Sequence, residues 1–172
     1  MFTGNIVLIG FMGTGKTTIG RLCAEKLSWD FVDTDQYIEQ FTNQRIPELF
    51  RISEAHFRAI ETQVFGEILS RGCQVVSTGG GIVTRPENRE LLASSRNLVF
   101  CLTARPNVIL RRVKTSAKRP LLDTPDPKKQ ICLLLKQRNS LYQSAADYRL
   151  DTSDKSIQAV VADIMALMEQ RR

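Results

Sequence analysis

The residues best suited to chemistry lie in a glycine-rich segment near the start of the chain, from Gly10 to Thr18. Its order is glycine, four residues, Gly-Lys and then threonine, which is the pattern of a loop that binds nucleotide phosphates. Glycines leave the backbone amides uncovered, so phosphate oxygens can approach them. Lys16 can reach the β- and γ-phosphates, and the Thr17 hydroxyl can hold Mg²⁺. The segment therefore predicts a site for a nucleoside triphosphate.

The elements expected on either side of this loop have the order that phosphate binding needs. Residues 5–9 form a short, β-branched apolar run, which is typical of a buried strand. After the loop, apolar residues recur at helical spacing at Ile19, Leu22, Cys23 and Leu27. A strand, a loop and a helix in this order direct the helix N-terminus at the anion. This context favours a functional loop over a chance match in a glycine turn.

Further along the chain, strands are expected to alternate with helices. Strands are expected at 30–33, 74–77, 97–102 and about 148–150, and helices from 36, at about 54–70, 86–95, 107–113 and 126–145, and from 157. Alternation predicts an α/β fold with a parallel sheet covered on both faces and ligands at the carboxyl ends of its strands. Residues 114–127 have no apolar period and are expected to form a mobile loop.

Composition limits the classes that this sequence fits. At 172 residues, the chain is long enough for a single α/β domain. Its net charge of +6 suits an anionic ligand, but no basic patch points to nucleic acid. The four cysteines have no metal-ligand spacing and are expected to be reduced core thiols. Neither a signal segment nor a membrane-length apolar run is found, so we expect a cytoplasmic protein without a membrane partner.

Two groups of polar residues accompany the phosphate loop. Asp33 and Asp35 end the second strand, where one carboxylate can serve a metal and the other a substrate; the alternative is a helix cap plus a surface acid. Arg58 has Glu54 and Glu61 about one helical turn away on either side. It is either a solvated ion pair or a guanidinium held ready for a substrate carboxylate.

Three more features remain candidates. Residues 79–81 are three glycines at a strand end, where bare amides can approach a ligand. Arg119 lies in the loop at 114–127 and can stabilise a transferring phosphoryl group. Arg138 lies on a helix whose apolar face is expected to include Leu133 and Leu134, and it is either aimed at an acidic substrate or exposed to solvent.

These segments together resemble the shikimate kinase family of small phosphate-loop kinases. The matching segments are residues 10–21, 31–35, 54–61, 79–81, 119–122 and 138–142, in order and spacing. The resemblance implies a single-domain, three-layer P-loop kinase fold over residues 1–172, with a five-stranded parallel sheet. It also implies a substrate-binding helical segment at about 34–62, a mobile lid at about 114–127, and a monomer. The implied reaction moves the γ-phosphoryl group of ATP to the 3-hydroxyl of shikimate.

The resemblance also implies roles for individual residues. Catalysis is implied for Asp35, Lys16 and Arg119. Binding of ATP is implied for Gly13, Thr14, Gly15, Lys16, Thr17, Thr18, Arg112, Arg119 and Lys155. Binding of shikimate is implied for Asp35, Arg58, Gly79, Gly80, Gly81 and Arg138. Mg²⁺ is implied at Thr17 and Asp33.

The sequence departs from the family pattern at two positions. Ser53 replaces a common glycine and is expected to alter how the Arg58 helix enters, and Ile157 replaces a common proline in the adenine loop and is expected to loosen the nucleotide contacts. Two alternatives stay open at this point. One is a related kinase for gluconate or an amino analogue of shikimate, and the other is a nucleotide switch without an acceptor.

Overall fold

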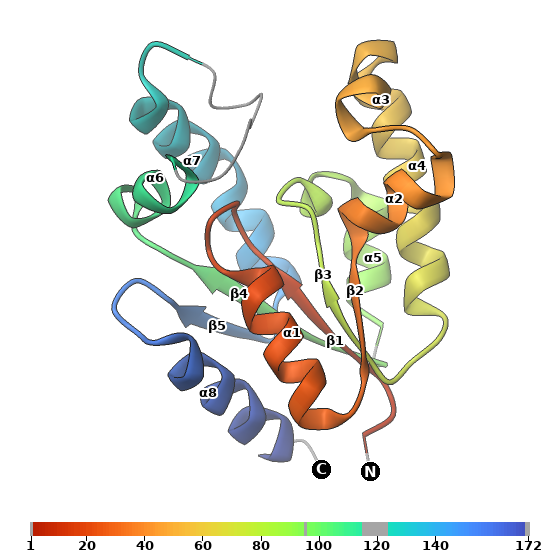
Figure 1. Ribbon diagram of the computed structural model, residues 1–172, viewed down its shortest axis with the longest axis vertical. Coiled ribbons are helices and arrows are strands. Elements are labelled where there is room, and N and C mark those ends of the chain that lie inside the picture. The colour runs from red at the N-terminus through yellow and green to blue at the C-terminus, as the bar shows by residue number, and fades with distance from the viewer. Residues whose placement is uncertain (1, 95, 115–123, 171–172) are drawn as a thin grey trace.

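The protein is built on a five-stranded sheet, shown in Figure 1, a computed structural model that describes residues 2–94, 96–114 and 124–170. The strands are β1 (Asn5–Ile9), β2 (Asp30–Asp33), β3 (Gln74–Ser77), β4 (Asn97–Thr103) and β5 (Tyr148–Asp151). Their order across the sheet is β2-β3-β1-β4-β5, and every pairing is parallel. The predicted five-stranded parallel sheet is confirmed.

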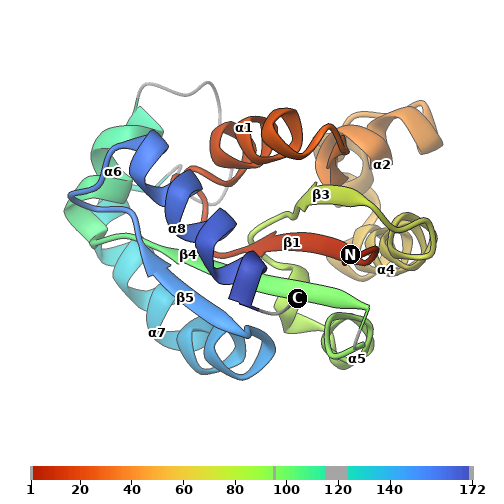
Figure 2. The same cartoon turned by 90° about the horizontal axis from the view of Figure 1, so that it is seen from below.

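Helices connect the strands and cover both faces of the sheet. They are α1 (Lys16–Leu27), α2 (Thr34–Thr42), α3 (Ile46–Ile52), α4 (Glu54–Leu69), α5 (Pro86–Leu92), α6 (Pro106–Lys114), α7 (Pro127–Ala145), α8 (Ile157–Gln170) and the short 3₁₀ turn η1 (Ile82–Thr84). Seen from below, α1 and α8 lie on one face, and α5 and α7 on the other (Figure 2). This is the predicted three-layer arrangement. Within the described ranges, no helix is long and apolar enough to cross a membrane.

The alternation of side chains along β1 explains why both faces are covered. Ile6 and Leu8 pack with apolar residues of α1 and α8, whereas Val7 and Ile9 pack with those of α4, α5 and α7. All four side chains are fully buried. Successive residues of a strand point to opposite faces, so an unbroken apolar run needs cover on both.

Several local details differ from the sequence expectations. Helix α2 begins at Thr34 rather than at 36, because the Asp33 side chain accepts hydrogen bonds from the amides of Asp35 and Gln36 and so caps the helix. Leu133 was expected on the buried face of α7 but is 49% exposed. The cysteines divide: two are buried, but Cys73 and Cys132 are exposed and are not core thiols.

Candidate functional site

The phosphate loop is already formed around its own lysine. Gly13 and Gly15 have φ values of 76° and 98°, in the left-handed region that favours glycine. The ammonium group of Lys16 donates to the carbonyls of Gly10 at 2.8 Å and Phe11 at 2.9 Å. The Thr14 hydroxyl donates to the Phe11 carbonyl at 2.8 Å. These bonds hold the loop in a closed turn at the N-terminus of α1, where its amides can receive phosphate oxygens.

Hydroxyl and carboxylate oxygens lie together beside the loop. Thr17 Oγ1 donates to Asp33 Oδ2 at 3.0 Å and lies 3.4 Å from Ser77 Oγ. Asp33 uses its other oxygen to cap α2, so the helix cap and the candidate metal ligand are the same side chain. Among the described residues, no group of three His, Cys, Asp or Glu side chains could hold a metal. Mg²⁺ usually needs only one or two carboxylates, with phosphates and water completing its shell, so the donors present fit it.

Two adjoining cavities fit the two halves of a nucleotide-dependent site. The first, about 260 Å³, is lined by the phosphate loop together with Asp33, Asp35, Ser77, Thr78, Gly79, Gly80 and Arg112. The second, about 300 Å³, is lined by Gly13, Thr14, Gly15, Thr18, Ile19, Arg112, Thr152, Lys155, Ile157 and Val160. The first is rich in polar groups suited to phosphate and an acceptor. The second is mostly apolar, which suits a flat base.

Arg112 lies on the boundary of the two cavities. Its guanidinium donates to the carbonyl of Gly13 at 3.2 Å and to the carbonyl of Thr152 at 2.7 Å. The Thr152 hydroxyl in turn donates to the Thr14 carbonyl at 3.0 Å, so the loop before α8 is tied to the phosphate loop. Lys155 lines the apolar cavity but is paired with Asp163 at 2.6 Å. Sequence reasoning missed Thr152, for which no sequence motif gave a signal.

Arg58 is not a surface ion pair. Its side chain is 10% exposed, and its Nη1 lies 2.7 Å from Glu61 Oε2, whose side chain is 1% exposed. Glu54 is the outer partner at 3.3 Å. The guanidinium also lies 5.1 Å from the ring centre of Phe57 and 5.9 Å from that of Phe50. Acids and rings thus fix a buried cation beside the site.

Glu61 is a buried member of this site, although the sequence indicated only an acid flanking Arg58. Burial raises the pKa of its carboxyl above the usual value, the negative charge of Asp35 adds to the rise, and the Arg58 guanidinium opposes it. Glu61 Oε1 and Arg58 Nε are buried atoms without a hydrogen-bond partner among the described residues. Buried polar atoms are normally paired, so this pair suits a site that a polar ligand completes.

The glycine turn at residues 79–81 lies directly against charged side chains of the site. A Cβ on Gly81 would lie 2.3 Å from Arg58 Nη2, and a Cβ on Gly79 would lie 2.9 Å from Asp35 Oδ1. The Gly79 amide donates to the Thr34 hydroxyl at 3.1 Å, which ties the turn to the start of α2. The glycine turn therefore allows Arg58 and Asp35 to approach the backbone from two sides.

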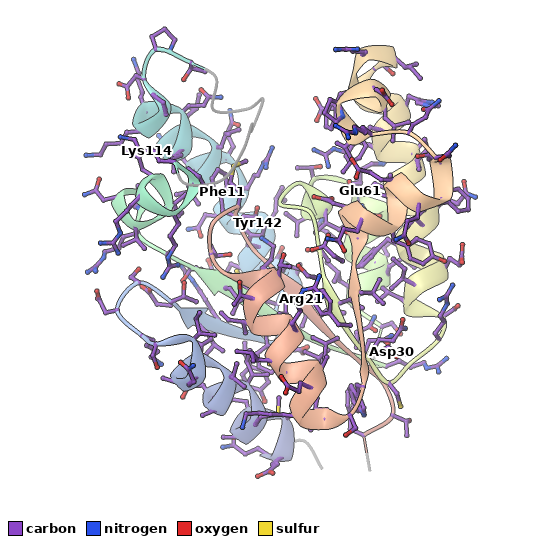
Figure 3. All side chains as sticks on the ribbon, viewed as in Figure 1. Phe11, Arg21, Asp30, Glu61, Lys114 and Tyr142 are labelled. Carbon is purple, nitrogen blue, oxygen red and sulfur yellow. The ribbon has the colours of Figure 1, made fainter. Side chains whose placement is uncertain are left out.

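Arg138 reaches the same turn from α7. Its Nη1 donates to the Gly80 carbonyl at 3.2 Å, and the hydroxyl of Tyr142 donates to the same oxygen. Figure 3 shows Tyr142 on α7 and Glu61 on α4 approaching this end of the sheet from two sides. The structure thus brings together Lys16, Thr17, Asp33, Asp35, Arg58, Arg138 and the glycine turn. Arg119 and most of the expected lid lie outside the described residues.

The structure places both departures from the family pattern and explains the first. Ser53 has an extended backbone (φ −173°), which any residue adopts, and its hydroxyl accepts from the His56 amide at 3.0 Å to cap α4. Glycine freedom is therefore unnecessary at the entry of the Arg58 helix. Ile157 is 41% exposed and lines the apolar cavity as the first residue of α8.

A parallel sheet with a phosphate loop between β1 and α1, and with the polar groups at the carboxyl ends of its strands, defines the class of P-loop nucleotide-binding proteins, to which phosphotransferases of this kind belong. The sequence model of the shikimate kinase family matches residues 12–169 of this chain. A shikimate kinase from Thermodesulfovibrio yellowstonii is 44% identical over 167 residues, which cover 96% of this chain and 95% of the relative. The chain belongs to the shikimate kinase family.

Solved structures agree with this assignment. A shikimate kinase from Acinetobacter baumannii in complex with shikimate matches with a TM-score of 0.93 at 37% identity, covering 99% of this chain and 95% of that one. A gluconokinase from Sinorhizobium meliloti 1021 matches with a TM-score of 0.62 at 17% identity, covering 96% of this chain and 91% of that one. The second likeness shows a shared fold alone.

Proposed function

We propose that the protein transfers the γ-phosphoryl group of ATP to the 3-hydroxyl of shikimate, giving 3-phosphoshikimate and ADP. Membership of the shikimate kinase family makes it an ATP-dependent phosphotransferase of aromatic amino acid biosynthesis. One observation carries the residue assignments: the phosphate loop and the buried Arg58–Glu61 pair meet at the glycine turn. A phosphate donor and an acidic acceptor can therefore be held within one cleft.

The nucleotide is held by the loop from Gly13 to Thr18. Its amides and the Lys16 ammonium bind phosphate oxygens, for which Lys16 exchanges its present bonds to backbone carbonyls. Arg112 and Lys155 border the adenine cavity. Thr17 and Asp33 would hold Mg²⁺, which would neutralise charge on the β- and γ-phosphates.

The acceptor is held by its carboxylate and its hydroxyls. Arg58 and Arg138 bind the carboxylate, since planar guanidinium groups match it with paired hydrogen bonds. The amides of Gly79, Gly80 and Gly81 line the same pocket. Asp35 accepts a hydrogen bond from the hydroxyl to be phosphorylated and takes its proton as the new bond forms. This arrangement favours a carboxylated polyol over a nucleotide acceptor.

The remaining assignments rest on the sequence. Residues 34–62 form the substrate-binding segment. The lid implied at about 114–127 and the phosphate contact implied for Arg119 stay proposals from the resemblance, since residues 115–123 lie outside the part of the chain that the structure describes. The protein works as a cytoplasmic monomer without a nucleic-acid or membrane partner. Size-exclusion chromatography with light scattering tests the monomer.

The test of function is ADP release from Mg·ATP in the presence of shikimate, gluconate, an amino analogue of shikimate or nucleoside monophosphates. Strong stimulation by shikimate alone is the expected result. Stimulation by another acceptor would keep the phosphate site but overturn the proposed substrate. Tight ATP binding with no stimulation by any acceptor would instead favour a nucleotide switch.

A further inference from the structure

Tyr142 lies behind the proposed substrate pocket and has no part in the function described so far. It is 3% exposed and packs in the apolar core between the sheet and α4, α5 and α7. Its hydroxyl nevertheless reaches the glycine turn and donates to the Gly80 carbonyl. A buried tyrosine normally satisfies its hydroxyl, but this one does so on a backbone oxygen of the site itself.

Arg138 donates to the same carbonyl through Nη1 at 3.2 Å. Arg138 and Tyr142 are four residues apart on α7, so they lie side by side on one face of the helix. A carbonyl oxygen has two lone pairs, and here each receives one donor. The orientation of the Arg138 guanidinium is therefore linked to that of Tyr142, both through the Gly80 carbonyl and through a direct hydrogen bond between the two side chains.

Gly80 also lies close to the phosphate loop. A Cβ on Gly80 would be 3.4 Å from the Met12 amide nitrogen, 3.6 Å from the Gly10 carbonyl and 3.8 Å from the Tyr142 hydroxyl. The turn is thus packed between the loop and α7. Three consecutive glycines have high backbone freedom, so an anchor on the middle one limits where the whole turn lies.

Burial keeps the phenol a donor, since it raises the pKa of Tyr142 to about 12. The hydroxyl stays protonated over the working pH range and donates to Gly80 throughout. Arg138 is half-buried, and its guanidinium carries further N–H groups besides the one that it donates to this carbonyl.

We propose that Tyr142 is a positioning residue: it fixes the Gly80 carbonyl, and the carbonyl fixes the guanidinium of Arg138 for the carboxylate of the acidic substrate. This inference rests on the carboxylate-binding role proposed above for Arg138. Tyr142 does not touch the substrate and acts through the turn. Its hydroxyl therefore contributes to binding of the acid and leaves nucleotide binding unaffected.

The decisive variant is Tyr142→Phe, which keeps the ring in the core and removes only the hydroxyl. We expect the KM for shikimate to rise about tenfold, because the buried carbonyl loses a donor and the arginine loses its fixed orientation. The KM for ATP and the melting temperature should stay close to those of the wild type. Tyr148→Phe is the matched control, because Tyr148 stacks on Phe100 at the edge strand and should leave both KM values unchanged.

A double-mutant cycle with Arg138→Ala separates positioning from general structural support. Tyr142→Phe should raise the KM for shikimate little further when Arg138 is already absent, and calorimetric titration of shikimate should give the same pattern. Two results would overturn this inference but leave the role of Arg138 intact. One is an equal rise of the KM for shikimate in both backgrounds. The other is a change of less than twofold in Tyr142→Phe together with a large change in Arg138→Ala. An unchanged KM in Arg138→Ala would overturn the role of that arginine and this inference with it. If the proposed function itself were wrong, shikimate would not stimulate ADP release by the wild-type protein.

Discussion

The two ends of the central sheet both carry buried polar side chains, but the two sets differ in charge and in hydrogen bonding. At the amino ends, the first residues of three adjacent strands are the amides Asn5, Gln74 and Asn97, each 0–3% exposed. At the carboxyl ends lie Lys16, Arg58 and Glu61 with the glycine turn. One set is neutral and the other is charged.

The amide set is closely hydrogen-bonded. Asn5 donates to the Leu69 carbonyl at 2.9 Å and to Asn97 at 3.2 Å, and Gln74 donates to the Ile68 carbonyl at 2.9 Å. Asn97 donates to the Leu91 carbonyl at 2.8 Å. These bonds join the beginnings of β1, β3 and β4 to the ends of α4 and α5. Neutral groups satisfied in this way stabilise the fold and leave nothing for a ligand.

The charged set leaves some of its capacity unused. Arg58 Nε and Glu61 Oε1 have no partner among the described residues, and burial raises the pKa of Glu61. Such groups lower stability unless a ligand completes them. The buried polar groups at the amino ends of the strands therefore stabilise the fold, whereas those at the carboxyl ends suit the proposed ligands. The difference lies in charge and in completeness of hydrogen bonding, not in burial.

The largest effect is expected for Asp35→Asn at the charged end. The substitution keeps the shape of the side chain but removes its ability to take the acceptor proton. We expect kcat to fall about a hundred- to ten-thousandfold, the range typical of a general base. Binding of ADP, measured by calorimetry, should stay within about twofold. Near-normal turnover would show that Asp35 only caps or borders the site.

A smaller loss is expected for Arg58→Ala. Loss of charge-assisted hydrogen bonds to the carboxylate should raise the KM for shikimate about thirtyfold, because such bonds contribute about 2 kcal/mol. Arg71→Ala is the matched control, since Arg71 lies just after the end of α4 and pairs with Glu67 of that helix, but its side chain is 51% exposed. Steady-state kinetics measures both. Equal KM values in the two variants would show that Arg58 does not bind the substrate carboxylate.

The amide end should respond in stability alone. Asn5→Ala leaves buried partners without a hydrogen bond and should lower the free energy of unfolding by about 2 kcal/mol. Urea denaturation measures this loss, and kcat and both KM values should match the wild type. Gln63→Ala removes an exposed amide of α4 and should change neither quantity. A kinetic defect in Asn5→Ala would mean that the two ends are coupled.

The smallest effect concerns pH. The folded protein binds the Glu61 proton more tightly than the unfolded chain, so the contribution of Glu61 to stability is greatest at low pH. It declines as pH rises from the ordinary pKa of 4.5 through the raised value. The unfolding free energy of the wild type relative to Glu61→Gln should fall over that range. The difference in unfolding free energy between the wild type and Asn5→Ala should stay constant over the same range, because the side-chain amide of Asn5 does not titrate. If urea denaturation gave the same pH dependence of stability for the wild type and Glu61→Gln, Glu61 would not bind its proton more tightly in the folded protein.

Sequence patterns alone were enough to predict the phosphate loop, the alternation of strands and helices, and the acids that end β2. These depend on interactions within a few residues: glycine conformation, side-chain period and helix capping. The predicted start of α2 was two residues too late, because the Asp33 side chain caps the helix directly after β2. The resemblance to a family then related motifs that lie far apart in the chain, from the phosphate loop to Arg138, to a single site.

Which polar residues are buried, and what they contact, depends on how the helices pack on the sheet. Nothing in the spacing of Arg58 and Glu61 separates a solvated pair from a buried one; burial comes from the Phe50 and Phe57 rings and the Gly81 turn. The amide cluster joins residues up to 92 positions apart, and Tyr142 meets Gly80 across 62. Such contacts form when the sheet and its helices pack together, and no local pattern in the chain records them.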